Sequence, residues 1–170
     1  RPAVPVSVNL SWMDFYDENM LGWIVSGLQC GGKEEEKMIR FEITETSLAA
    51  IGENHTWMLM RLRENGAKIL LDDFGSGYSS FGMLQDYDFD ILKIDISFVR
   101  NIGVNKKTES ILRAIIDMAH QLGIRLVAEG AETEEQVAFL RENGCDYIQG
   151  YYYYKPMPQA EFLQLLEEGK

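Results

Sequence analysis

Histidine, cysteine and long apolar runs are scarce in this chain of 170 residues, which contains two His and two Cys. Cys30 and Cys145 stand alone, with no Cys-x-x-Cys pair and no His partner, so neither a disulfide framework nor a zinc site is indicated. No apolar run approaches the ~20 residues of a membrane span, and no signal peptide opens the chain. We therefore expect a soluble segment without membrane contact, either cytoplasmic or the cytoplasmic portion of a larger sensor protein.

Positive charge is also in short supply. The chain carries 16 Lys and Arg against 27 Asp and Glu, a formal net charge of −11, and shows no basic stripe. This balance argues against a nucleic-acid polymer as partner and suits a site that gathers carboxylates around metal ions. The length fits one domain. Because the chain starts at Arg1 and runs almost at once into a strand pattern, we expect a trimmed fragment of a longer protein.

The stretch Lys68–Ser80 organises the rest of the chain. Its first apolar residues are typical of a strand buried on both faces, and they lead directly into two adjacent carboxylates, Asp72 and Asp73. Neighbouring side chains on a strand point to opposite faces, so these two share one site only where the strand gives way to a loop. Such close like charges repel unless a cation lies between them. Gly75 and Gly77 then permit a tight loop, and an Asp-rich turn that caps a helix is the alternative explanation.

The same unit recurs along the chain: an apolar run, a polar residue at its end, then a helix. We expect strands over 6–10, 38–43, 69–71, 89–96, 124–128 and 147–148, and helices over 19–28, 57–64, 81–85, 108–122, from Thr133 and from Gln159. Thr133 and Gln136 have the spacing of a capping box. The apolar stripe of helix 108–122 is expected to face the core and consists of Ile111, Ile115, Met118, Ala119 and Leu122.

This alternation predicts an α/β fold with a parallel sheet, closed either as a doubly wound open sheet or as a (β/α)₈ TIM-like barrel. The strand-like runs end in polar residues: Asn9, Glu42, Asp72 with Asp73, Lys93, Glu129 and Gln149. In a barrel all these ends meet at one mouth, whereas in an open sheet only the strands near the switch point share a site. The barrel is therefore favoured, with about six of its eight units in this chain.

The strand ends also predict the chemistry. The expected metal ligands all offer oxygen: Asn9, Glu42, Asp72, Asp73 and Glu129. Oxygen ligands without His or Cys select hard cations, and two Mg²⁺ or Mn²⁺ ions would activate water and clamp a phosphoryl displacement. Lys93 would add a point charge that holds the water or the phosphate. Taken singly, Glu42 could be a paired strand residue, Asn9 a turn former and Lys93 a surface lysine.

These residues also carry a family resemblance. The matching motifs, in chain order, are Ser7–Ser11, Glu42–Glu45, Asp72–Ser80, Leu92–Asp95, Val127–Gly130 with Glu132 and Thr133, and Gln149–Tyr151 with Lys155 and Pro156. In order and spacing they cover nearly the whole chain, and the chain resembles the EAL domain, the phosphodiesterase of cyclic di-GMP signalling. The resemblance implies a metal-dependent enzyme that hydrolyses cyclic di-GMP to linear pGpG.

The resemblance also implies roles for individual residues. The same five oxygen side chains would ligate the ions, and the catalytic group would be Lys93, near the nucleophilic water, with Glu129 and Asp73. Gln149 would line the mouth and bind substrate. Glu45 would brace the loop after the central strand, which in this family couples the active site to dimerisation, so a homodimer is expected. The supporting residues would be Glu45, Asp95, Phe74, Gly75, Ser76 and Gly77.

One departure limits the resemblance. The Glu-Ala-Leu tripeptide that names the family does not occur here, and the Arg beside it is absent too. Both would lie upstream of Asn9. We therefore expect residues 1–170 to be an N-terminally truncated EAL phosphodiesterase domain, impaired when alone, with regulatory domains fused upstream in the parent protein.

Two other functions stay open. A non-catalytic EAL-like receptor would bind cyclic di-GMP and signal through a partner, but such members usually lose metal ligands, and those visible here are all present. A barrel glycosidase would use a carboxylate pair. The adjacent Asp72 and Asp73 and the strand-end Lys93 fit that reaction poorly.

Overall fold

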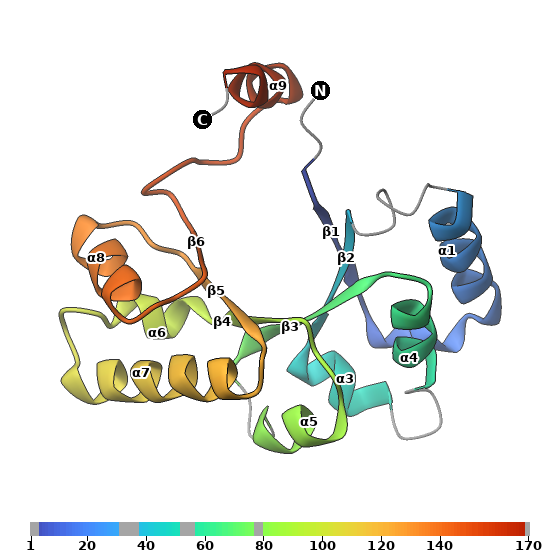
Figure 1. Ribbon diagram of the computed structural model, residues 1–170, viewed down its shortest axis with the longest axis horizontal. Helices are drawn as coiled ribbons and strands as arrows, with labels where there is room; N and C mark the ends of the chain where they lie inside the picture. Colours follow the sequence, from blue (N-terminus) through green and yellow to red (C-terminus); the bar gives the residue numbers. More distant parts are fainter. Residues whose placement is uncertain (1–3, 31–37, 52–56, 77–79, 169–170) are drawn as a thin grey trace.

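The computed structural model describes residues 4–30, 38–51, 57–76 and 80–168. Its described part contains one sheet of parallel strands whose hydrogen-bonded neighbours follow the chain order throughout. The strands are β1 (Val6–Leu10), β2 (Ile39–Thr44), β3 (Lys68–Phe74), β4 (Ile91–Ile94), β5 (Arg125–Glu129) and β6 (Tyr147–Gln149). They curve into an open half-barrel with β1 and β6 at its two edges (Figure 1).

Helices connect the strands and cover the outside of the half-barrel, while the last helix stands away from the sheet (Figure 1). The helical elements are η1 (Trp12–Tyr16), α1 (Glu18–Cys30), α3 (Glu45–Ile51), α4 (Trp57–Glu64), α5 (Ser80–Asp86), α6 (Ile96–Arg100), α7 (Lys106–Gln121), α8 (Glu134–Glu142) and α9 (Gln159–Glu167). Within the described ranges, none of them combines the length and the apolar character needed to cross a bilayer.

The order of the strands decides between the two closures that the sequence allows. A doubly wound sheet reverses its strand order at a switch point. The six strands described here run from β1 to β6 without any reversal. The structure is therefore a partial (β/α)₈ barrel, as the polar strand ends predict.

The core lies mainly between the outer face of the sheet and the helices. Strand residues that point outward, such as Ile69, Leu71, Leu92 and Ile94, are at most 1% exposed and belong to the large apolar cluster. A central parallel strand that is buried on both faces reads as an apolar run, which is why the sequence pattern located these strands. Burial of these side chains holds the strand ends in register.

Helix α7 corrects one prediction. Leu112, Ile115, Ile116 and Ala119 form its buried face, at the i, i+3, i+4, i+7 spacing of a helical stripe. Two residues of the expected stripe are instead exposed, Ile111 at 43% and Leu122 at 54%. Ile115 and Ala119 belong to both faces, but the buried face also contains Leu112 and Ile116, so it is rotated about the helix axis relative to the predicted stripe.

Three short helical segments, η1, α3 and α6, are missing from the sequence prediction. They contain only 5, 7 and 5 residues, too few for a helical period to emerge. The available signal is capping. Asp95 accepts a hydrogen bond from the Ser97 amide at 2.8 Å and caps α6, while Asp14 of η1 accepts one at 2.6 Å from the amide of Ser11, the N-cap residue of η1.

The capping box of α8 is confirmed and gives a direct test of local stability. The Thr133 hydroxyl accepts a hydrogen bond from the Gln136 amide at 3.3 Å, and the Gln136 side chain accepts one from the Thr133 amide at 3.0 Å. Thr133→Ala should lower the free energy of unfolding by about 1 kcal/mol, because it leaves a helix-end donor without its partner. Chemical denaturation monitored by circular dichroism measures the change.

Thr108→Ala is the matched control, because Thr108 lies inside the first turn of α7, whose cap is Asn105. That substitution should stay within about 0.5 kcal/mol of wild type. Equal losses in the two variants would show that the α8 cap contributes nothing of its own.

Candidate active site

Side-chain alternation along three central strands places the candidate residues on the inner face of the half-barrel. Leu70, Ile91 and Val127 form a small buried cluster separate from the main core. Two positions further along the same strands come three of the candidates: Asp72, Lys93 and Glu129. Because successive residues of a strand alternate faces, these side chains point to the same side as the small cluster. They therefore lie at the carboxyl ends of β3, β4 and β5.

Lys93 is the centre of the site. Its Nζ lies 2.6 Å from Glu42 Oε2, 2.7 Å from Glu129 Oε1 and 3.1 Å from Asp72 Oδ1. The lysine side chain is only 8% exposed. Three carboxylates thus meet at the Lys93 ammonium group, although Glu42 and Glu129 lie 87 residues apart in the chain (129 − 42).

A β-bulge brings Asp73 to the same site. The register between β3 and β4 shifts between Leu71 and Phe74, and Asp73 has a φ of 56°, which is unusual for a residue other than glycine. Its amide donates to Asp72 Oδ1 at 2.9 Å. The predicted strand 69–71 is too short, because β3 continues to Phe74, and Asp73 lies in the bulge, where its charge interacts with those of Asp72 and Lys93.

The charges at this site are unbalanced. Burial raises the pKa of Asp73, and the charges of Asp72 and Asp95 raise it further. Burial also raises the pKa of Glu129 above its ordinary value, although its hydrogen bond to Lys93 opposes the shift. Burial alone would lower the pKa of Lys93, but the hydrogen bonds to Glu129 and Glu42 and the charge of Asp72 raise it overall. One ammonium therefore faces more carboxylate charge than it can neutralise.

Asn9 and Gln149 extend this line of side chains to the two edge strands. Asn9 stands beside Glu42 in the register of β1 with β2, and Gln149 stands beside Glu129 in the register of β5 with β6. Both residues are exposed. The structure thus places the six predicted strand ends along one rim of the half-barrel.

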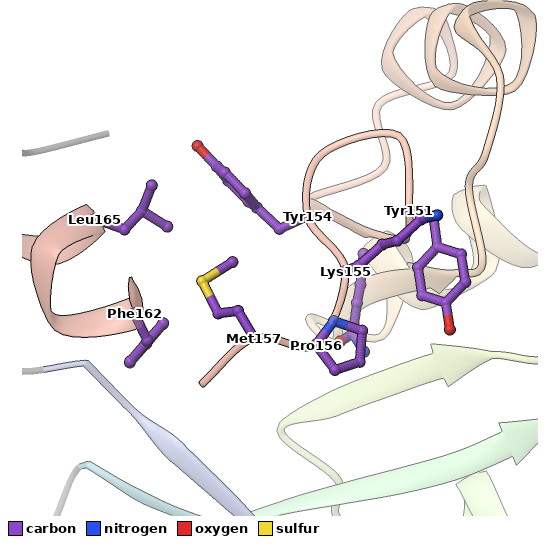
Figure 2. A pocket seen from close by; sticks show the side chains of 9 residues that line it. Tyr151, Tyr154, Lys155, Pro156, Met157, Phe162 and Leu165 are labelled. Carbon is purple, nitrogen blue, oxygen red and sulfur yellow. The ribbon is translucent and has the colours of Figure 1, made fainter. Parts of the chain in front are cut away.

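Gln149 borders a pocket that the sequence analysis missed (Figure 2). The pocket has a volume of about 380 Å³ and is mostly apolar, and its other lining residues are Gly150, Tyr151, Tyr154, Lys155, Pro156, Met157, Phe162 and Leu165. The Lys155 ammonium lies 5.5 Å from the centre of the Tyr151 ring. The run of four tyrosines at 151–154 was the available signal, but only the fold shows that α9 closes the other side.

The start of the loop after β3 is held by Glu45 of α3 and by a hydrogen bond back to β3. Glu45, at the start of α3, is 3% exposed and accepts a long hydrogen bond of 3.4 Å from the Gly75 amide. Phe74 is buried, and the Ser76 amide donates to the Asp73 carbonyl at 3.1 Å. Gly77 lies outside the described residues. A supporting role of this loop in function stays a prediction.

The donor chemistry fits a hard divalent cation. Carboxylate oxygens from β2, β3 and β5 lie within 3.1 Å of one cationic nitrogen, and the excess negative charge would be relieved by a further cation. In the described part of the chain, however, no group of three or more His, Cys, Asp or Glu side chains is arranged as a metal site. The carboxylates are directed to Lys93 instead, so metal ligation by Asn9, Glu42, Asp72, Asp73 and Glu129 stays a prediction.

Together these features define a (β/α)-barrel domain with an acidic, lysine-centred site at the carboxyl ends of its strands. Comparison with known families gives the more specific identification. The family model described as "EAL domain" matches residues 1–156, and the chain belongs to the EAL domain family.

Curated relatives are consistent with this assignment. The chain is 42% identical over 128 residues to the cyclic di-GMP phosphodiesterase NbdA of Pseudomonas aeruginosa, covering 75% of this chain and 16% of that protein. It is 39% identical over 125 residues to the cyclic di-GMP phosphodiesterase RocR of the same organism, covering 74% of this chain and 32% of RocR. The chain therefore spans less than two thirds of these relatives.

Solved structures show the same fold. The EAL domain of Mycobacterium smegmatis DcpA superposes with a TM-score of 0.86 at 31% identity, covering 98% of this chain and 74% of that chain. The PaMucR phosphodiesterase, in a complex with c-di-GMP, superposes with a TM-score of 0.81 at 30% identity, covering 93% of this chain and 64% of that chain.

The raised pKa of Asp73 predicts a dependence of stability on pH. Since the folded state binds this proton more tightly than the unfolded state, the contribution of Asp73 to stability falls as pH rises from its ordinary pKa of 3.8 through the raised value. Asp73→Asn removes the charge, and Asn accepts a positive φ. Without divalent ions the variant should gain stability relative to wild type at pH 7 and lose that advantage below pH 3.8.

Urea denaturation of both proteins across this pH range measures the difference in unfolding free energy. Asp88→Asn is the control, because Asp88 has a side chain 89% exposed and lies outside the site. A stability difference between Asp73→Asn and wild type that does not change with pH would contradict the assigned electrostatics.

Proposed function

We propose that this chain belongs to a metal-dependent phosphodiesterase that hydrolyses cyclic di-GMP to linear pGpG. The observation that carries the proposal is the convergence of Glu42, Asp72 and Glu129 on the Lys93 ammonium at the carboxyl ends of the strands. This is the end of a (β/α) barrel where active sites lie. The relatives named as cyclic di-GMP phosphodiesterases supply the substrate class.

Two Mg²⁺ or Mn²⁺ ions would be held by oxygen ligands from four strands: Asn9, Glu42, Asp72, Asp73 and Glu129. A pair of such ions supplies a water activated at neutral pH and neutralises charge on the phosphate. One similar structure, of Klebsiella pneumoniae BlrP1, is described as a manganese complex with cyclic di-GMP. That description supports the choice of metal proposed here.

Lys93 acts in this proposal as a fixed positive charge. Its raised pKa keeps the ammonium protonated at neutral pH, so it cannot take a proton from water as a general base. It can donate hydrogen bonds to the attacking water or to a phosphate oxygen. Asp73 and Glu129, whose pKa values are raised, are the more suitable proton acceptors.

The pocket beside Gln149 is suited to part of the substrate. The amide of Gln149 offers both a donor and an acceptor for a base edge. The rings of Tyr151 and Tyr154 and the side chain of Phe162 offer apolar area for a flat purine (Figure 2). Because Gln149 pairs with Glu129 across β5 and β6, a base in this pocket would lie beside the acidic site. A homodimer, upstream regulatory domains and a cytoplasmic location stay predictions.

Lys93→Ala tests the proposal. In the full-length protein that contains this chain, it should lower cyclic di-GMP turnover in Mn²⁺ by about 10²-fold or more, the loss expected when one charge-stabilising group leaves a preorganised site. It should weaken Mn²⁺ binding far less, because Lys93 orients rather than ligates. Chromatographic assay of pGpG formation gives the rate, and titration calorimetry gives the metal affinity.

Lys68→Ala is the matched control. Lys68 also forms a lysine–carboxylate pair, with its Nζ 2.6 Å from Asp90 Oδ1, but at the opposite end of β3. Turnover of cyclic di-GMP by Lys68→Ala should stay near that of the wild-type protein. Near-normal turnover by Lys93→Ala, or full wild-type turnover in excess EDTA, would refute the proposed mechanism.

A further inference from the structure

Helix α6 fills the space between the connections that follow β3 and β5. It starts at Ile96, three residues after Lys93, and Val99 anchors it in the core with no exposed surface. Two hydrogen bonds of Asp95 hold the start of the helix. The Asp95 carboxylate accepts one from the Ser97 amide, and the Asp95 amide donates one to the Phe74 carbonyl at 3.4 Å. The helix thus sits beside the candidate site without supplying any of its charged groups.

Phe98 of α6 lies against Gly75 in the β3 connection. A Cβ atom added to Gly75 would come within 2.5 Å of Phe98 Cε2 and 2.9 Å of Cζ, closer than real Cβ atoms approach. Gly75 also has a φ of 91°, which side chains rarely adopt. The backbone that follows β3 therefore meets the aromatic ring directly at Gly75, two residues after Asp73.

Ile96 makes the equivalent contact on the other side. A Cβ atom added to Gly130 would overlap Ile96 Cγ1 and Cδ1 and lie 3.2 Å from its Cβ. Cβ and Cγ1 are near the base of a β-branched side chain whose χ1 is restricted, so of the three atoms only the terminal Cδ1 can move away readily. Gly130 directly follows Glu129, so the Ile96 side chain rests on the backbone that carries this carboxylate.

We propose that Ile96 and Phe98 are positioning residues, a wedge that sets the spacing of Asp73 and Glu129 on either side of Lys93. Both glycines follow a candidate carboxylate closely, and both are in van der Waals contact with the same five-residue helix. A shift of α6 would therefore move the two carboxylates relative to the lysine, whose Nζ is 2.7 Å from Glu129. The inference rests on the proposed function for its catalytic consequence and on the contacts alone for its geometry.

Gly130→Ala, made in the full-length protein, tests the wedge. It should lower kcat by about 10²-fold, the loss that a displacement of about 1 Å causes at a preorganised site, and leave KM nearly unchanged. Adding Ile96→Ala makes room for the new methyl group and should recover at least about tenfold of that loss. Ile96→Ala alone introduces no overlap and no positive-φ strain, so it tests the wedge even where Gly130→Ala does not fold.

Gly123→Ala is the matched control. Gly123 also has a positive φ, 72°, but a Cβ there meets nothing within 4 Å, and the residue lies before β5, away from the site. It imposes the same kind of backbone strain without a wedge contact, so kcat should stay within about threefold of wild type. Mn²⁺ affinity, followed by electron paramagnetic resonance, should weaken in Gly130→Ala and not in Gly123→Ala.

The outcomes separate the wedge from the proposed function. Equal kcat losses in Gly130→Ala and Gly123→Ala, no recovery with Ile96→Ala, or full activity of Ile96→Ala alone would overturn the wedge. If the wild-type protein hydrolyses no cyclic di-GMP, the proposed function fails. A double-mutant cycle on the unfolding equilibrium constants then tests the wedge. At least tenfold coupling between substitutions at positions 96 and 130, with none between 96 and 123, supports it. Equal coupling in the two pairs refutes it.

Discussion

The structure depends on one buried ammonium group held by three carboxylates. Lys93 loses almost all contact with water, and a lysine in that position keeps its charge only because Glu42 and Glu129 accept its hydrogen bonds and the Asp72 carboxylate pairs with it at 3.1 Å. Each of the four residues comes from a different strand of the parallel sheet. The interaction therefore exists only when β2, β3, β4 and β5 are in register, and it couples the fold to the proposed chemistry.

Clusters of cationic and carboxylate side chains lie at both ends of the strands, but only the cluster at the carboxyl ends has an excess of negative charge. At the amino-terminal end, Asp90 pairs with Lys68 Nζ at 2.6 Å and Arg63 Nε at 3.6 Å, and Arg63 also pairs with Asp88, so two cations face two carboxylates. At the carboxyl end, carboxylates outnumber their cation, and the pKa values of Asp73 and Glu129 are raised. A balanced cluster stabilises, whereas an excess of one charge costs stability and creates affinity for cations.

Much of this arrangement could be predicted from the sequence, because apolar runs mark central strands and the first polar residue after each run marks the rim. Asp72, Lys93, Glu129 and Gln149 follow that rule, whereas Asn9 and Glu42 lie in strands where polar and apolar residues alternate. The bulge at Asp73 could not be predicted, since a positive φ at a residue other than glycine is imposed by the surrounding sheet. Nor could the buried face of α7, because its contacts with distant segments decide it, and the five residues of α6 are too few for a helical period, so its only local signal is the Asp95 cap.

The central claim is that the carboxylates around Lys93 form a site for divalent cations. Diffraction at the manganese absorption edge, from crystals of the full-length protein soaked in Mn²⁺, tests it most directly. We expect anomalous density between Glu42, Asp72 and Glu129, with Lys93 no longer within hydrogen-bonding distance of all three. Crystals that show no anomalous density there, with Lys93 still paired to all three carboxylates, would contradict it.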